Sequence, residues 1–147
     1  MIIKVKVVIE SSIENLDASG LPEGDIEKNI AEADGFYRFS EGNIFLSYIE
    51  KGDNGVCRTE ITSIGGELTV RRGGAIESEM RFMEGESHSS VYSIPPYQFD
   101  VTVTTKRIRL DLTDSGGKIN LFYNMKIGGA DKSARMKIWI SQASSQN

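Results

Sequence analysis

The chain has 147 residues, of which 39% are hydrophobic and 26% are charged, and its formal net charge is −4. This length supports one core-forming domain, and the sequence has no Pro- or Ser-rich tract to link two domains. It has no apolar run of the about 18 residues that a membrane-spanning helix needs. The single cysteine, Cys57, excludes an internal disulfide and is typical of a reducing compartment. We therefore expect one cytoplasmic domain over residues 1–147.

The charge is distributed unevenly along the chain. Residues 1–50 carry 4 basic and 10 acidic side chains, whereas residues 51–147 carry 13 basic and 11 acidic ones. The basic residues of the second part are interspersed with acids and do not form the continuous stripe typical of nucleic-acid-binding proteins. We therefore expect no nucleic-acid partner.

Alternating apolar and polar residues predict the first strand, because successive strand side chains point to opposite faces. Its inward residues are Ile3, Val5, Val7 and Ile9. Residues 11–27 show no sustained period and contain two glycines, a proline and five acids. We interpret residues 11–27 as a loop. Two alternatives stay open for it, a lid over a barrel mouth or a solvated connection.

Two glycine-containing turns then predict successive β-hairpins. Glu41-Gly42 and Gly65-Gly66 fit two-residue turns, in which glycine adopts left-handed backbone angles without steric cost. The first turn sets Tyr37 and Phe39 against Leu46 and Ile44, with Tyr48 on the same side. The second turn brings the inward residues of its two arms onto one shared face, which consists of Cys57, Thr59, Ile61, Leu68 and Val70.

Residues 67–84 predict a central hairpin with an arginine on its apolar face. We expect a three-residue loop, Gly73-Gly74-Ala75, because it aligns the apolar faces of the two arms. The expected pairs are Arg72 with Ile76, Val70 with Ser78, and Leu68 with Met80. Arg72 then points inward near its strand end. Its guanidinium either reaches the rim or is held by an internal carboxylate or a ligand.

The remaining chain predicts four more strands. A weak strand over residues 86–94 ends at Pro95-Pro96, and a second begins at Tyr97. The alternation slips by one residue near Lys106, which indicates a β-bulge. Glycine turns at 114–117 and 128–131 separate the last three strands from one another. We expect the tail over residues 142–147 to be frayed.

These elements predict an all-β protein of about ten antiparallel strands with virtually no helix. Each strand pairs with its neighbour in sequence, as in a meander. One apolar face per strand indicates either a β-sandwich or a closed or nearly closed barrel. We favour the barrel, because closure pairs the first strand with the last and removes exposed edges.

Several of these segments give the chain a resemblance to a known family. The segments are Gly35-Phe36-Tyr37, residues 44–48, Arg72-Gly73-Gly74-Ala75, Met80-Arg81-Phe82, Thr105-Lys106 with Ile108, Asp111-Leu112, and Gly117-Lys118-Ile119 with Tyr123 and Met125. As a set, over about residues 30–140, they resemble the YwiB-like family of uncharacterised bacterial proteins, a domain of unknown function. The resemblance implies a calycin-type, lipocalin-like β-barrel and brings no established activity or catalytic residues.

Catalytic and metal-site signatures are sparse. His88 is the only histidine and Cys57 the only cysteine, too few for a histidine-based metal site or a catalytic triad. We interpret His88 as a solvated residue at a strand edge and Cys57 as a small core residue. We expect a protein that is not an enzyme and that needs neither metal nor cofactor.

The predicted interior is the remaining candidate site. Its lining would consist of Arg72, Tyr37, Phe39, Tyr48, Met80, Tyr97, Phe99, Tyr123 and Met125. Such a set forms either an ordinary filled core or a cavity for a small, partly apolar ligand whose anionic group meets Arg72. We expect a ligand-binding module. The alternative is a filled barrel that acts through protein contacts, for example as a homodimer, and exposed residues motivate it: Phe45, Ile49, Arg135, Lys137 and Trp139.

Overall fold

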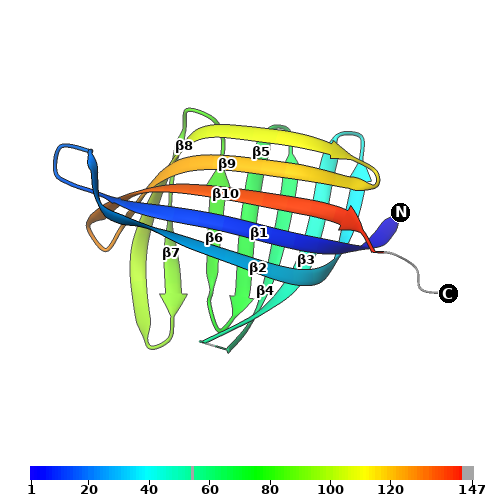
Figure 1. The fold of residues 1–147 in the computed structure, drawn as a ribbon, viewed down its shortest axis with the longest axis horizontal. Helices are drawn as coiled ribbons and strands as arrows, with labels where there is room; N and C mark the ends of the chain where they lie inside the picture. The colour runs from blue at the N-terminus through cyan, green and yellow to red at the C-terminus, as the bar shows by residue number, and fades with distance from the viewer. Residues whose placement is uncertain (54, 144–147) are drawn as a thin grey trace.

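The computed structural model describes residues 1–53 and 55–143, and this part of the chain folds into ten antiparallel strands without a helix. Figure 1 shows their arrangement. The strands are β1 (Ile2–Leu16), β2 (Pro22–Ser40), β3 (Asn43–Gly52), β4 (Gly55–Ile64), β5 (Glu67–Gly74), β6 (Ser78–Phe82), β7 (Ser87–Ile94), β8 (Tyr97–Thr113), β9 (Gly116–Ile127) and β10 (Ala130–Gln142). Within the described residues, no helix could cross a membrane.

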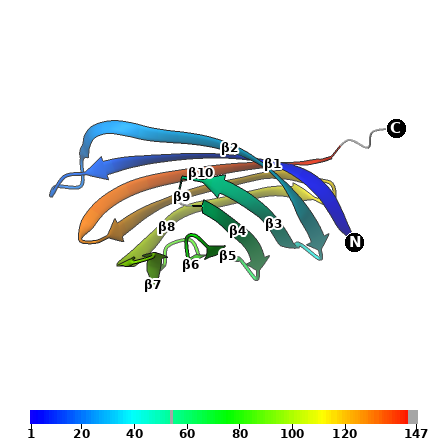
Figure 2. The same cartoon turned by 90° about the horizontal axis from the view of Figure 1, so that it is seen from below.

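The strands form one nearly closed barrel. Their order in the sheet is β6-β5-β4-β3-β2-β1-β10-β9-β8-β7, so β1 pairs with β10 as predicted. The remaining gap lies between β6 and β7. A single bridge crosses this gap, where the backbones of Glu77 and Ser93 exchange two hydrogen bonds of 2.9 and 2.8 Å. Figure 2 shows β8, β9, β10, β1 and β2 as one wall and β3 to β7 as the other.

The two-residue turns confirm the predicted hairpin registers. Tyr37 pairs with Leu46 across β2 and β3, and Ile61 pairs with Val70 across β4 and β5. Gly65 and its neighbour Gly66 have φ angles of 58° and 86°, which a residue with a Cβ rarely adopts. Glycine at both positions therefore closes this hairpin without strain.

The predicted register of the central hairpin is wrong by two residues. Arg72 pairs with Ser78 and Val70 with Met80, so residues 73–77 separate the paired arms, and the first two of these still pair with β4. The loop is longer because its backbone bonds to other strands: Ala75 donates a hydrogen bond of 3.0 Å to a carbonyl of β4, and residue 77 forms the bridge to β7. A shift by two preserves the face of every side chain. The inward placement of Arg72 therefore holds.

Residues 11–27 are not a loop, contrary to the prediction. β1 continues through Leu16 and β2 begins at Pro22, so only residues 17–21 connect them. Within this turn the Asp17 carboxylate accepts two backbone hydrogen bonds, of 2.8 and 3.0 Å. The hairpin extends past the end of the barrel (Figure 1). No residue of 11–27 is fully buried, so the sequence carries no sustained apolar alternation that would reveal the strands.

The β-bulge of β8 follows the prediction, whereas the first residue of the predicted frayed tail, Gln142, belongs to β10. The register of β8 against β9 shifts between Thr105 and Arg107, which leaves Lys106 as the bulged residue. β10 extends through Gln142, and the amide of Ala143 donates a hydrogen bond of 3.0 Å to the Lys4 carbonyl. The rest of the predicted frayed tail, residues 144–147, lies outside the described residues.

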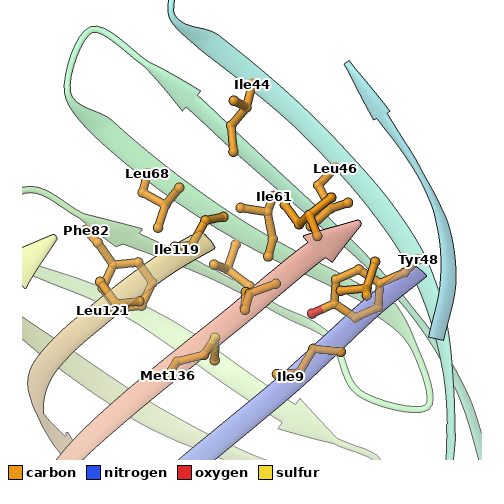
Figure 3. Close-up of a cluster of buried hydrophobic side chains, with 14 of the residues drawn as sticks. Ile9, Ile44, Leu46, Tyr48, Ile61, Leu68, Phe82, Ile119, Leu121 and Met136 are labelled. Carbon is orange, nitrogen blue, oxygen red and sulfur yellow. The ribbon is translucent and has the colours of Figure 1, made fainter. Parts of the chain in front are cut away.

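Side chains from both walls fill most of the interior. Figure 3 shows part of this apolar cluster, with side chains from β1, β3, β4, β5, β6, β9 and β10 directed toward one another. The largest fully buried members include Tyr37, Phe82, Leu46, Ile61 and Ile119. A filled core thus accounts for this part of the barrel. A ligand cavity can lie only outside the packed cluster.

Candidate functional site

A polar row crosses the inner face of the barrel at one end of the packed core. Tyr48 on β3 pairs with Thr59 on β4, which pairs with Arg72 on β5. Directly paired residues share a face of the sheet, so these three side chains all point inward. Tyr48 and Thr59 are buried, and the row continues to Ser78 on β6.

Arg72 lacks a hydrogen-bond partner for part of its guanidinium. Its Nε atom is buried and bonds to no described atom. The nearby Glu50 carboxylate instead accepts a hydrogen bond of 3.3 Å from the Thr59 hydroxyl. No described carboxylate forms an ion pair with Arg72. A buried donor without a partner costs free energy, so a hydrogen-bond acceptor at this atom would stabilise the site.

The groups around Arg72 keep it charged. Burial alone opposes the charge, but Tyr48, Tyr92 and Glu50 interact with the guanidinium and its pKa is raised above the ordinary value. Burial likewise raises the pKa of the Tyr48 and Tyr123 phenols. The Arg72 cation therefore lies among neutral phenols, with one carboxylate, that of Glu50, nearby. A guanidinium with a free donor is complementary to an anion that accepts hydrogen bonds.

A hollow of about 560 Å³ opens beside Arg72. It is lined by Asn29, Ile30, Ala31, Glu32, Glu50, Lys51, Gly52, Asp53, Gly55, Cys57, Arg72, Ala75 and Ile76. Ala31, Ala75 and Ile76 contribute apolar surface. The lining also carries three carboxylates against two cations, so a molecule with several negative charges would be repelled. The chemistry fits a small molecule with one anionic group, an apolar part and hydrogen-bond donors.

Several predicted lining residues belong to the packed core instead of the hollow. Tyr37 is fully buried and donates a hydrogen bond of 2.6 Å to the Thr113 carbonyl. Burial, with Asp114 nearby, raises the pKa of Tyr37 to about 12. Tyr123 is buried against Phe82, with their ring centroids 4.9 Å apart. The other core members among the predicted residues are Phe39 and Met80, which are partly buried, and Met125, which is buried.

Two predicted lining residues are wrong. Tyr97 and Phe99 are 65% and 38% exposed. They share the strand face of the buried Val101 and Val103, but they lie in the first part of β8, before its buried stretch begins. Face alternation reports the side of the strand and cannot report where the opposite wall ends.

The site includes residues that sequence reasoning missed. Glu50 follows Tyr48 by two positions, so face alternation alone would have placed it inward. Tyr92 gave no comparable signal, because β7 carries polar residues on both faces. His88, predicted to be solvated, is half buried, and its Nδ1 atom is buried without a hydrogen-bond partner. It pairs with the buried Val103 and therefore faces inward.

The environment of Cys57 agrees with the prediction. Cys57 is buried, and its Sγ atom lies 3.7 Å from the Ile76 carbonyl, as expected for a small core residue. The described residues contain no group of three or more histidine, cysteine or acidic side chains that could hold a metal ion. The distinctive chemistry of the site is therefore the Arg72 guanidinium with the Tyr48 and Thr59 hydroxyl groups in the same row.

Comparisons with known proteins agree with this fold. Residues 19–140 match the family described as "Domain of unknown function (DUF1934)". The "Uncharacterized beta-barrel protein YwiB" of Bacillus subtilis (strain 168) is 33% identical over 94 residues, which cover 64% of this chain and 66%, just under two-thirds, of that protein. The crystal structure of ywiB protein from Bacillus subtilis superimposes with a TM-score of 0.84 at 26% identity, over 97% of this chain and 94% of that one. The chain belongs to the DUF1934 family of β-barrel domains of unknown function.

Proposed function

We propose that this protein is a non-catalytic binding module for a small, partly apolar molecule with one anionic group. The observation that carries the proposal is the Nε atom of Arg72, which is buried and has no described hydrogen-bond partner beside a hollow of about 560 Å³. Ligand sites combine apolar surface with a few polar groups that fix orientation, and this volume lies within their usual range.

The ligand's anionic group would meet Arg72. A carboxylate at this position accepts hydrogen bonds from the guanidinium, which is a stronger interaction than one between neutral groups. The Tyr48 phenol belongs to the same inward-facing row as Arg72 and would supply a further donor. The apolar part of the ligand would contact Ala31 and Ile76, which line the same hollow.

The acidic residues of the hollow restrict the ligand class. Glu32, Glu50 and Asp53 surround the cation, so a nucleoside triphosphate or another multiply charged anion would be repelled. A monocarboxylate that also carries an amine or hydroxyl group would pair its carboxylate with Arg72 and donate hydrogen bonds from its second group to the acidic residues. We therefore place amino acids, their derivatives and hydroxylated organic acids before simple fatty acids.

Thermal shift with a panel of small carboxylic acids tests this function. Binding at 100 times the dissociation constant stabilises the folded state by about 2.7 kcal/mol, which produces a clear rise in melting temperature. Arg72→Met should abolish the rise. Arg71→Met is the matched control, because Arg71 is exposed on the opposite face and bonds to Glu79. No stabilisation by any panel member, together with no ligand retained from bacterial lysate in native mass spectrometry, would contradict the proposal.

A further inference from the structure

The outer surface of the barrel carries a basic groove that the proposed ligand site does not use. The groove has a volume of about 510 Å³ and is lined by Lys106, Arg107, Arg109, Asn120, Leu121, Phe122, Arg135, Met136 and Lys137. Five of these residues are basic, and none of the described lining residues is acidic. The fold thus gathers cations that the sequence intersperses with acids.

Strand register explains how the groove is built. Arg107 on β8 and Arg135 on β10 both pair with Phe122 on β9, and Arg109 and Lys137 both pair with Asn120. Each row therefore places an uncharged side chain between two cations. The cations on β8 and β10 lie two strand spacings apart, about 10 Å. β9 forms the floor of the groove, and the basic side chains form its two walls.

The charges of the groove lack partners within the described chain. None of the five cations forms an ion pair with a described residue. The Arg135 guanidinium lies over the Phe122 ring, 4.5 Å from its centroid. Glu10 pairs in register with Lys137 on the neighbouring strand but forms no ion pair with it. Like charges held this close repel one another, and an incoming anionic surface relieves that repulsion.

The same wall of the barrel carries a surface of the opposite sign. The acidic hairpin is the projecting part of β1 and β2, residues 14–27, and contains five acids and no lysine or arginine. Leu21 and Ile26 within it are 61% and 51% exposed. Figure 1 shows the hairpin extending from the same layer as β8, β9 and β10. Each molecule thus offers both an acidic arm and a basic groove.

We propose that the acidic hairpin of one molecule docks on the basic groove of a second copy of this chain. A two-fold arrangement forms this contact twice, since each copy provides one arm and one groove. The carboxylates of the arm reach the cations on both walls, and its exposed apolar residues leave water. A nucleic acid is the weaker candidate, because the chain is acidic overall, at −4, and the neighbouring hairpin would repel a polyanion.

Sedimentation of the wild-type protein across concentrations gives the first test. The dimer should weaken by about tenfold or more when salt rises from about 0.1 M to about 1 M, because the Debye length falls from about 10 Å to about 3 Å. A protein that stays monomeric at about 0.1 M salt and millimolar concentration overturns the proposal. So does a dimer whose strength is independent of salt.

Paired charge reversals give the decisive test. The groove variant is Arg107→Glu with Arg109→Glu, and the arm variant is Glu23→Lys with Glu27→Lys; all four residues are exposed. Each variant alone should be monomeric. A 1:1 mixture should form a heterodimer, because one of its two contacts joins the unchanged groove of the arm variant to the unchanged arm of the groove variant, as in the wild type.

Two controls separate the effect of the groove from those of net charge and of unfolding. A third variant, Arg38→Glu with Arg58→Glu, makes the same charge change at exposed positions outside the groove and should dimerise like the wild type. Circular dichroism melts confirm that each variant folds. Failure of the mixture to associate while both variants are folded contradicts the proposal. Binding of single-stranded RNA by a monomer, lost in the groove variant, would overturn it by reassigning the groove to nucleic acid.

Discussion

Replacing Arg72 with methionine separates a structural role of this arginine from a role in binding. Methionine retains much of the unbranched stem and removes the guanidinium. If Arg72 were half of a buried ion pair, removing it would leave an uncompensated charge and cost about 3–5 kcal/mol. No described carboxylate forms an ion pair with Arg72, and its buried Nε atom has no hydrogen-bond partner.

The expected change in stability follows from that geometry. Removing a buried donor without a partner recovers about 1–3 kcal/mol. The loss of attraction between the guanidinium and Glu50 offsets part of this gain. We therefore expect Arg72→Met to leave the free energy of unfolding unchanged or to raise it by up to about 2 kcal/mol, which is a few degrees in melting temperature for a chain of this size.

Urea unfolding of three proteins measures this change: wild type, Arg72→Met and the exposed control Arg71→Met. The control loses only a surface ion pair with Glu79, whose Arg71 Nε to Glu79 Oε2 distance is 3.2 Å, and should change stability by less than about 1 kcal/mol. A loss of more than about 2 kcal/mol in Arg72→Met alone would refute the reasoning, because it would reveal a structural partner for this side chain.

Three further substitutions and one control, Gly73→Ala, test by urea unfolding how the barrel is held together. Gly35→Ala should cost about 1–3 kcal/mol because the added Cβ would overlap a backbone carbonyl of β3, whereas Gly73→Ala, in open space, should change stability by less than about 0.5 kcal/mol. Phe82→Ala should cost about 3–5 kcal/mol through the cavity it leaves in the core. Tyr37→Phe should cost about 1–2 kcal/mol by removing the hydrogen bond to Thr113. Burial raises the folded-state pKa of Tyr37 to about 12, so this tyrosine stabilises the wild type below about pH 10 and loses that effect as pH rises toward 12. Tyr37→Phe should therefore lose less stability than the wild type between about pH 10 and pH 12. An equal loss of stability in both proteins would contradict this prediction.

The sequence predicted the hairpins whose registers are set by adjacent turn residues. Gly65-Gly66 closes a two-residue turn, so the pairing of Ile61 with Val70 follows from local information. The central hairpin differs, because its loop bonds to β4 and β7, which are distant along the chain. Only the face of Arg72 could be predicted there, since a shift by two residues preserves it.

The failures elsewhere have a common physical cause. Apolar alternation exists only where one strand face is buried, so the acidic hairpin, in which no residue is fully buried, gave no strand signal. Apolar alternation also does not show where the packed interior ends. The prediction therefore wrongly placed Tyr97 and Phe99 inside the barrel, although both lie beyond its packed part. The basic groove could not be predicted either. Its cations come from β8 and β10, and only the pairing of both strands with β9 brings them together.

The most direct test of the proposed binding site is an NMR measurement of the Arg72 Nε–H group, which is buried and has no described hydrogen-bond partner. The Nε–H resonance is assigned by its absence from Arg72→Met and is followed while small carboxylic acids are added. A binding site predicts that one class of acid shifts this resonance in a saturable way and slows exchange of its proton with water. An Arg72 Nε–H resonance that stays unchanged with every acid, at concentrations that fill the hollow, would contradict the proposed binding site.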